Sequence, residues 1–254
     1  MSKLRAFLLH FSISATIVGT LLAIVFFIWY PRPFFEIGGA WNVVQILVGV
    51  DLILGPCLTL VVYKPNKPRL RFDMTVIAIV QLVALFYGSI TIYGERPQYV
   101  VFVIDRYNVL AGQDLAGRKF DDSDWRKKPL IGPRLAVAEL PEDVEEQQKL
   151  MFDIVFGAPD LEKRPELWHP FDEKKDTVLA KAKPISGLAS AGPDVAARVS
   201  KLNSHYGSSY GDLVYVPVVG RSLQGFALVI DPVTARPLDI VNVDPWELPA
   251  GDQS

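Results

Sequence analysis

The sequence predicts a membrane protein in which three transmembrane α-helices precede an α+β domain with a mostly antiparallel sheet. Three apolar segments, residues 7–29, 41–63 and 74–93, are each close to the roughly 20 residues that cross about 30 Å of hydrocarbon. After Tyr93 the composition is polar, and short β-rich runs alternate with amphipathic helical patterns. We therefore expect a transmembrane domain over residues 1–93 and a second domain over residues 94–254.

The charges that flank the apolar segments predict the orientation of the chain. Lys and Arg are enriched in short cytoplasmic loops. Lys3 and Arg5 precede the first segment. The connector after it carries only Arg32 against Glu36, whereas the hinge between the second and third segments is basic. The basic residues of this hinge are Lys64, Lys67, Arg69 and Arg71. The pattern predicts a multi-pass protein of the bacterial inner membrane with a cytoplasmic N-terminus and a periplasmic C-terminal domain.

The first segment differs from a cleaved signal peptide. Its apolar run of 23 residues is longer than the roughly 7–15 residues of a signal-peptide core, and no Ala-x-Ala site follows before Pro31. We expect it to remain as a transmembrane helix. The net charge of −2 and the pI near 6.0 give no indication of nucleic-acid binding. The single cysteine, Cys57, lies in the second segment, so no intramolecular disulfide is expected, and we interpret it as a small buried apolar residue.

Asp51 is the most unusual residue of the apolar segments. It lies about 15 Å into the second one, where a carboxylate costs at least ~2.5 kcal/mol and must face protein or water. Asp51, Gly55 and Thr59 recur every four residues and share one helix face. The third segment has a similar small and polar stripe, and we expect the two faces to meet. Its members are Ala78, Gln81, Ala84 or Leu85, and Gly88.

Helix rise predicts which side chains lie at the same depth. Counted from Tyr63, Asp51 is about 18 Å deep, and counted from Met74, Tyr87 is about 19 Å deep. We therefore expect the Tyr87 hydroxyl to reach Asp51 and Gln81 to lie nearer the level of Cys57 and Leu58. Pro56 removes one backbone donor and weakens the second helix. The cluster is interpreted either as an element that holds the bundle together or as a docking notch for a helix of another protein.

An intramembrane aspartyl protease is not indicated. Acid and base roles require two carboxylates with different environments, and only Asp51 lies at depth. Asp73 falls at the start of the third segment beside Arg71, and Gly49-Val50-Asp51 lacks the Gly-x-Gly-Asp pattern.

Five stretches carry a family resemblance. They are VDLILGP at residues 50–56, KPNKPR at 64–69, QLVALFYG at 81–88, Arg96-Pro97, and FVIDR at 102–106. Over residues 1–110 the chain resembles the type IV pilin accessory proteins of the TfpX/TfpZ group. The resemblance implies a non-enzymatic, chaperone-like accessory protein that aids subunit-specific pilus assembly or surface display and needs no cofactor or metal. It implies as partners the type IV pilin subunit, other proteins of the pilus assembly platform and the lipid bilayer. The pilin, or fimbrial, subunit that the resemblance implies has one apolar N-terminal helix in the bilayer and a globular head in the periplasm.

The elements of the second domain follow from local patterns. Arg96-Pro97 marks the membrane exit and favours extended backbone. Apolar and β-rich runs predict strands at 98–104, 213–219, 224–230 and 238–243. Amphipathic patterns predict helices at 141–156, 173–183 and 193–204. Asp105-Arg106 is interpreted as a strand end near the membrane interface.

The rest of this domain gives weaker signals. Residues 111–140 are expected to be irregular, and their acids Asp121, Asp122 and Asp124 lack the spacing of a calcium loop. The segment around Gly207 and Gly211 is expected to be a loop. Neither His169 nor His205 belongs to a metal or nucleophile motif. Four aromatic residues are candidates either for an exposed binding patch or for the core: Trp168, Trp246, Tyr206 and Tyr210.

Two other classes of function stay open at this stage. A membrane-anchored sensor would bind a ligand in the outer domain, and it would need an output module from a partner because the chain carries none. A membrane enzyme, or the obligate subunit of one, would show an activity that depends on a polar residue such as Asp51.

Overall fold

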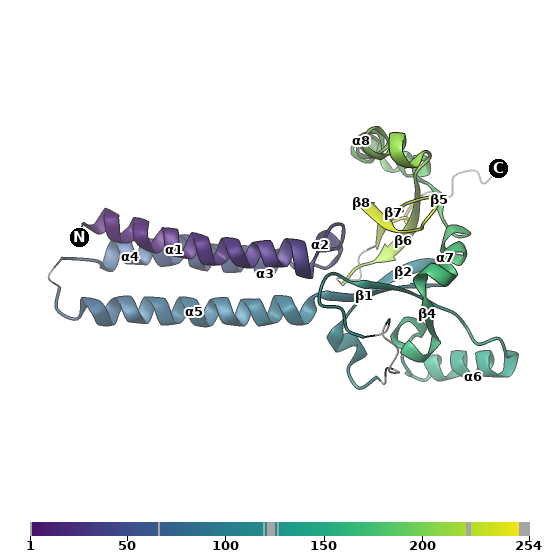
Figure 1. The fold of residues 1–254 in the computed structure, drawn as a ribbon, viewed down its shortest axis with the longest axis horizontal. Coiled ribbons are helices and arrows are strands. Elements are labelled where there is room, and N and C mark those ends of the chain that lie inside the picture. Colours follow the sequence, from purple (N-terminus) through teal and green to yellow (C-terminus); the bar gives the residue numbers. More distant parts are fainter. Residues whose placement is uncertain are drawn as a thin grey trace. The chain divides into compact units, whose positions relative to one another are not determined.

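The computed structural model describes residues 2–65, 67–118, 120, 125, 127–221 and 225–248 (Figure 1). The chain forms two compact units. Unit 1 comprises Met1–Pro31 and Ala40–Arg96, and unit 2 comprises Arg32–Gly39 and Pro97–Ser254. Residues 32–39, which connect the first two apolar segments, thus belong to the same unit as the C-terminal part of the chain. This segment is called the connector below.

Unit 1 contains three helices that are long and apolar enough to cross a membrane, as the sequence predicts. The first span is α1 (Lys3–Ile24), which continues into a π-helical turn at Val25–Trp29. The second span consists of α3 (Trp41–Val48), a π-helical segment Gly49–Leu54 and α4 (Gly55–Val62). The third span is α5 (Leu70–Glu95). Their length and composition identify a membrane protein, whereas the orientation remains a prediction.

The second span packs against both the first and the third span. At the end of the bundle next to the connector, the first and third spans also touch each other. There the Tyr30 hydroxyl donates a 2.9 Å hydrogen bond to the Ile92 carbonyl. The Trp29 and Tyr93 rings form an edge-on pair with centroids 5.1 Å apart. This aromatic contact fixes the ends of the first and third spans relative to each other.

Unit 2 contains a mixed sheet whose described strands follow the order β4-β3-β1-β2-β6-β7-β8, with β5 paired to β6. The strands are β1 (Pro97–Val103), β2 (Arg106–Ala111), β3 (Arg134–Ala138), β4 (Trp168–Pro170), β5 (Lys183–Pro184), β6 (Val214–Val219), β7 (Gly225–Ile230) and β8 (Pro237–Val241). The β1–β3 and β2–β6 pairings are parallel and the other pairings are antiparallel. The predicted α+β class with a mostly antiparallel sheet is confirmed.

Apart from the short helix α2 (Phe34–Ile37), the α-helices described in unit 2 lie where the sequence predicts them, but their ends differ from the prediction by up to six residues. They are α6 (Val144–Val155), α7 (Phe171–Leu179) and α8 (Pro193–Tyr210). Asp143 caps α6 by accepting hydrogen bonds from the backbone N–H groups of Glu145 and Glu146. The helix α8 continues to Tyr210, so the prediction of a loop that includes Gly207 was wrong. Gly211, with a φ of +71°, ends this helix.

The core occupies both faces of the sheet. In the central strand β1, Val100 and Phe102 belong to one apolar cluster, whereas Tyr99, Val101 and Val103 belong to the other. This alternation follows the two-residue period of a strand. A third cluster lies under α8 and against β6, β7 and β8. Because β1 is buried on both faces, its residues from Tyr99 to Val103 lack the usual alternation with polar residues.

The connector forms part of the first of these clusters. Its short helix α2 (Phe34–Ile37) buries Phe34 and Ile37 beside residues of β1, β6 and β7. The Arg221 N–H donates a 3.1 Å hydrogen bond to the Ile37 carbonyl. At Gly220 a Cβ would lie 2.7 Å from that carbonyl oxygen, so only glycine leaves room for this contact. The connector is therefore a structural element of unit 2.

Two other expectations need correction. Strands β2 and β3 overlap the stretch 111–140 that was expected to be irregular, and β2 was not predicted at all. Cys57 is exposed on the surface of the bundle, because it lies off the face that carries Asp51, Gly55 and Thr59. The acids Asp121, Asp122 and Asp124 lie outside the described residues.

Candidate functional site

A buried polar cluster lies within the spans of unit 1. Asp51, in the π-helical segment of the second span, is 4% exposed, and Gln81 of α5 is 8% exposed. The Gln81 carboxamide nitrogen donates to the Asp51 carboxylate oxygen Oδ1 and to the Asp51 backbone carbonyl, both at 3.3 Å. These hydrogen bonds join the second span to the third at the depth of the carboxylate.

Two glycines allow the helices to approach closely here. A Cβ at Gly55 would overlap the Gln81 carboxamide, and a Cβ at Gly88 would lie 3.1 Å from Leu47 Cδ1. The predicted meeting of the two small and polar faces is confirmed where Gly55 approaches Gln81. Gly88 instead lies against Leu47, which was not part of the predicted stripe. Thr59, the third member of the stripe on the second span, contacts the first span. Pro56 directly follows Gly55 and supplies no backbone N–H, and the segment before it, Gly49–Leu54, is π-helical.

The predicted depth relations were wrong. The Tyr87 side chain is 74% exposed and does not form the hydrogen bond to Asp51 that was expected, whereas Gln81 does. The error arises from the start of the third helix, which begins at Leu70 and not at Met74. Asp51 precedes Val62 by eleven residues, and Gln81 follows Leu70 by eleven, so both lie about 16 Å from the hinge.

The first span adds a histidine that sequence reasoning missed. His10 Nδ1 and the hydroxyl of Thr59 are 2.5 Å apart, and Thr59 is fully buried. The sequence did contain a signal for His10, because ionisable residues in membrane spans are rare and usually face a polar neighbour. The cluster therefore draws on all three spans.

The hydrogen bonding of the cluster is incomplete. Among the described residues, Asp51 Oδ2 and Gln81 Oε1 are buried side-chain atoms without a hydrogen-bond partner. Both are acceptors, so the group that would complete them is a donor. Polar groups in spans hold helices together by hydrogen bonds, whether within one protein or between two. In the described part of the chain no group of three or more His, Cys, Asp or Glu residues is placed to hold a metal ion.

Replacement of Gly55 by Ala should break the contact between Asp51 and Gln81. The added methyl overlaps only the end of the Gln81 side chain, which can rotate away at the expense of its hydrogen bonds. We expect the bundle in detergent to lose about 0.6–1.7 kcal/mol, the range measured for hydrogen bonds between spans. Thermal unfolding followed by circular dichroism measures this. Gly49→Ala is the matched control, because no atom lies within 4 Å of a Cβ there, and an equal loss in both variants would contradict the explanation.

The residues of the hinge and of the membrane exit lie apart from this cluster. In the hinge, Lys67 pairs with Asp73 at 2.8 Å, and Arg69 adopts a left-handed conformation immediately before α5. Lys64 and Arg71 are exposed. Their part in setting topology stays a prediction.

At the other end of α5, Arg96 is buried with its guanidinium 4.4 Å from the Tyr93 ring centroid, and Pro97 starts β1. Asp105 lies in the β1–β2 turn and Arg106 is the first residue of β2, so the full length of β1 separates them from Pro97. They form a 2.8 Å ion pair. The strand expected to end here ends at Val103, and Arg106 begins the next one. The place of both residues near the membrane exit stays a prediction.

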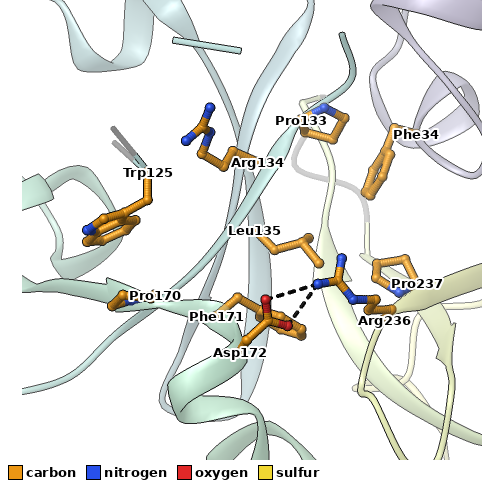
Figure 2. Close-up of a pocket in the computed structure, with 10 residues that line it drawn as sticks. All are labelled: Phe34, Trp125, Pro133, Arg134, Leu135, Pro170, Phe171, Asp172, Arg236 and Pro237. Atoms are coloured by element: carbon orange, nitrogen blue, oxygen red, sulfur yellow. Dashed lines mark hydrogen bonds and ion pairs between the residues drawn. The ribbon is translucent and has the colours of Figure 1, made fainter. Parts of the chain in front are cut away.

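Unit 2 contains a partly open cavity of about 470 Å³ (Figure 2). The start of β3, the edge strands β4 and β8, the first turn of α7 and the connector all contribute to its wall. Arg236 and Asp172 pair across it at 2.8 and 3.1 Å, both largely exposed. Phe34 of the connector lies in the wall near Pro133. The cavity thus combines apolar walls with an exposed ion pair and contains no catalytic arrangement.

The four aromatic candidates have different environments. Trp168 is buried, and its indole N–H donates to the Glu162 carbonyl at 3.1 Å. Burial also raises the pKa of the Glu162 carboxyl. Trp246 is 43% exposed beneath the Arg106 guanidinium, and Tyr206 packs beside Tyr210 in α8. The four residues therefore do not form a single exposed patch.

The two histidines of unit 2 have ordinary surroundings. His169 lies 3.8 Å from the Glu139 carboxylate, which also pairs with Lys174. The His205 ring packs edge-on against Tyr206.

Comparison with known proteins gives similarity to fimbrial assembly proteins. Residues 1–39 match the family described as fimbrial assembly protein FimB. The chain is 27% identical over 250 residues to the fimbrial assembly protein of serogroup I from Dichelobacter nodosus, covering 94% of this chain and 95% of the relative. It is 30% identical to the serogroup E1 protein over 70% of each chain. It is 36% identical to the protein of serogroups C1 and C2, covering 42% of this chain and 83% of the relative. No solved structure matches the chain.

Proposed function

This chain belongs to the family of fimbrial assembly proteins, and from that membership we propose that it is a non-enzymatic, chaperone-like accessory protein for a type IV pilin. It acts in the inner membrane and aids the subunit-specific assembly or surface display of the pilus. Its partners are the membrane-embedded pilin subunit and proteins of the assembly platform. The family is one of assembly proteins and not a known enzyme family.

The polar cluster in the spans is the observation that carries this proposal. A carboxylate and a carboxamide are held at depth by close helix packing, and one acceptor atom of each has no partner in the described residues. We propose that a donor on the apolar helix of a pilin subunit completes the cluster. The interaction would select a subunit by a hydrogen bond that lipid cannot supply.

The orientation in the proposal rests on two observations. The connector packs into the core of unit 2, which supports a position of residues 32–39 on the same side of the membrane as the sheet. The second and third spans separate them in the sequence, and two crossings return the chain to that side. The basic hinge favours the cytoplasm for the opposite side. We therefore propose that unit 2 is periplasmic.

Photocrosslinking in cells tests the proposal. Leu54 and Leu58 lie on the same side of the second span as Asp51 and are 52% and 40% exposed, so a benzoylphenylalanine probe fits there without filling the cluster. Ile53 is 63% exposed and points to the other side of the helix, which makes it the matched control. We expect a tagged pilin subunit to be trapped from positions 54 and 58 and at least about fivefold less from position 53, because a specific contact covers one face.

Two results would contradict the proposal. The first is trapping of lipid alone from positions 54 and 58. The second is equal trapping of pilin from all three positions, which is the result expected for random collision in the bilayer. If no pilin is trapped and the purified protein carries a small molecule bound in the cavity of unit 2, the membrane-anchored sensor becomes the better explanation.

A further inference from the structure

The helix α6 exposes a large apolar surface to solvent. Five side chains form it, each at least half exposed: Val144 (62%), Met151 (51%), Phe152 (64%), Val155 (80%) and Phe156 (73%). At 100° per residue, Val144, Met151 and Val155 fall on one line along the helix, and Phe152 and Phe156 form the adjacent line. The Phe152 and Phe156 rings are in contact, with centroids 4.4 Å apart. This set of five is called the α6 apolar face.

The α6 apolar face is not needed to attach the helix to the domain. A different side of α6 packs inward, with Leu150 6% exposed and Ile154 partly buried beside β1, Leu161 and Trp168. Most surface helices have one apolar stripe, and that stripe faces the core. Here a second stripe is left open to solvent. Contiguous apolar surface of this kind marks an interaction site on a soluble domain.

The charges around the α6 apolar face identify the chemistry of its occupant. The helix and the turn before it carry five acids and one base. The acids are Glu142, Asp143, Glu145, Glu146 and Asp153, and the base is Lys149. An amphipathic helix that binds an anionic lipid surface instead has a polar face rich in Lys and Arg. The acidic rim repels such a surface and attracts a basic one, so a protein with a complementary rim is favoured over the membrane.

We propose that the α6 apolar face is the docking surface for the globular head of the fimbrial subunit, through an apolar patch on that head rimmed by Lys and Arg. The identity of the partner rests on the proposed function, whereas the surface and its charge preference rest on α6 alone. Phe152 and Phe156 are the central anchors, because aromatic side chains contribute most to interface affinity. Glu145 and Glu146 steer the association and make it weaken with salt.

Paired variants of the full-length protein test the surface. In Phe152→Ser/Phe156→Ser we expect co-purification of a tagged subunit from solubilised membranes to fall about tenfold or more, as for loss of hot-spot aromatics. Val233→Ser is the control, since Val233 is an equally exposed apolar residue (68%) elsewhere on unit 2. Thermal unfolding of both variants should match the wild type, because the residues are exposed. The double variant Glu145→Lys/Glu146→Lys should capture less of the tagged subunit, and the amount captured should no longer depend on salt.

A photocrosslinking probe at Val155 separates failure of this inference from failure of the proposed function. Trapping of the subunit from Val155 supports the docking surface. If positions 54 and 58 of the second span trap the subunit and Val155 does not, the docking surface is wrong and the proposed function stands. If none of the three positions traps it, both are wrong. Trapping only of lipid or of a second copy of this chain from Val155 would also overturn the inference, as would an unchanged yield in the double serine variant.

Discussion

Replacement of Ile37 by Ala should destabilise unit 2 by about 2–5 kcal/mol, although this residue lies far from the rest of the unit in the sequence. Ile37 is fully buried, and its neighbours in the core cluster come from β1, β6 and β7. The backbone around it cannot collapse to fill the space, because the Ile37 carbonyl is held by the Arg221 N–H and packs against Gly220. The cavity that remains adds to the lost burial.

Urea unfolding of the purified protein in detergent, followed by tryptophan fluorescence, measures this loss. Ile131→Ala is the matched control, since Ile131 also belongs to unit 2 and is 71% exposed. It should change the free energy of unfolding by less than about 0.5 kcal/mol. Equal stability of the two variants would show that the connector does not belong to the folded core.

The same argument predicts that residues 97–254 expressed alone are less stable than with residues 32–39 added as a peptide.

Replacement of Asp51 by Leu should reduce the recovery of a pilin subunit with this protein by roughly 5- to 30-fold, corresponding to about 1–2 kcal/mol for a polar contact between spans. Leu has nearly the same size but offers no acceptor to a donor on the partner helix. Asp51→Asn has one side-chain oxygen in place of two, so it can accept from the Gln81 carboxamide or from the donor on the partner, but not from both as Asp51 does. Its recovery should therefore lie between those of Asp51→Leu and the wild type. Leu and Asn are both close to Asp in size, so a difference in subunit recovery between the two variants reports hydrogen bonding and not side-chain shape.

The stability of the bundle distinguishes the two interpretations of Asp51. A buried charge is often replaced by an apolar residue at no cost in stability. If Asp51 serves a partner, Asp51→Leu unfolds in detergent at the wild-type temperature or above, and only subunit recovery falls. If it holds the bundle together, unfolding shifts to a lower temperature in Asp51→Leu and subunit recovery falls with it. Unchanged recovery in Asp51→Leu would contradict the docking notch.

Local signals were sufficient to predict much of this fold. The three spans follow from apolar runs of suitable length, and the β6–β7–β8 meander follows from β-rich runs separated by turn residues. Asp51 and Gln81 were placed on helix faces that meet, but Gln81 was placed at the wrong depth, and Tyr87 was expected as the partner of Asp51. Helix faces depend on residue spacing, which the sequence contains. Depth depends on where α5 begins, and Leu70 and Arg71 extend that helix into the polar hinge.

Other features depend on tertiary contacts that no local pattern reports. The connector is eight residues long, and nothing in Phe34 or Ile37 indicates that strands more than sixty residues away will cover them. The strand β3 is five residues long and lies next to residues of mixed composition, so its parallel pairing with β1 determines its conformation. The sequence predicts α6 only as an amphipathic helix, because periodicity shows that a helix has apolar residues but not which of them the domain covers.

The connector also orders the steps by which the protein is made. Residues 32–39 are synthesised before the second and third spans, and their partners in β6 and β7 are made last. Phe34 and Ile37 therefore lack their core contacts until the strands that cover them have been synthesised and have reached the same side of the bilayer. With one of the later spans not inserted, the sheet would be on the other side of the membrane from Phe34 and Ile37, and this part of the core could not form. Completion of the fold therefore depends on the insertion of both later spans.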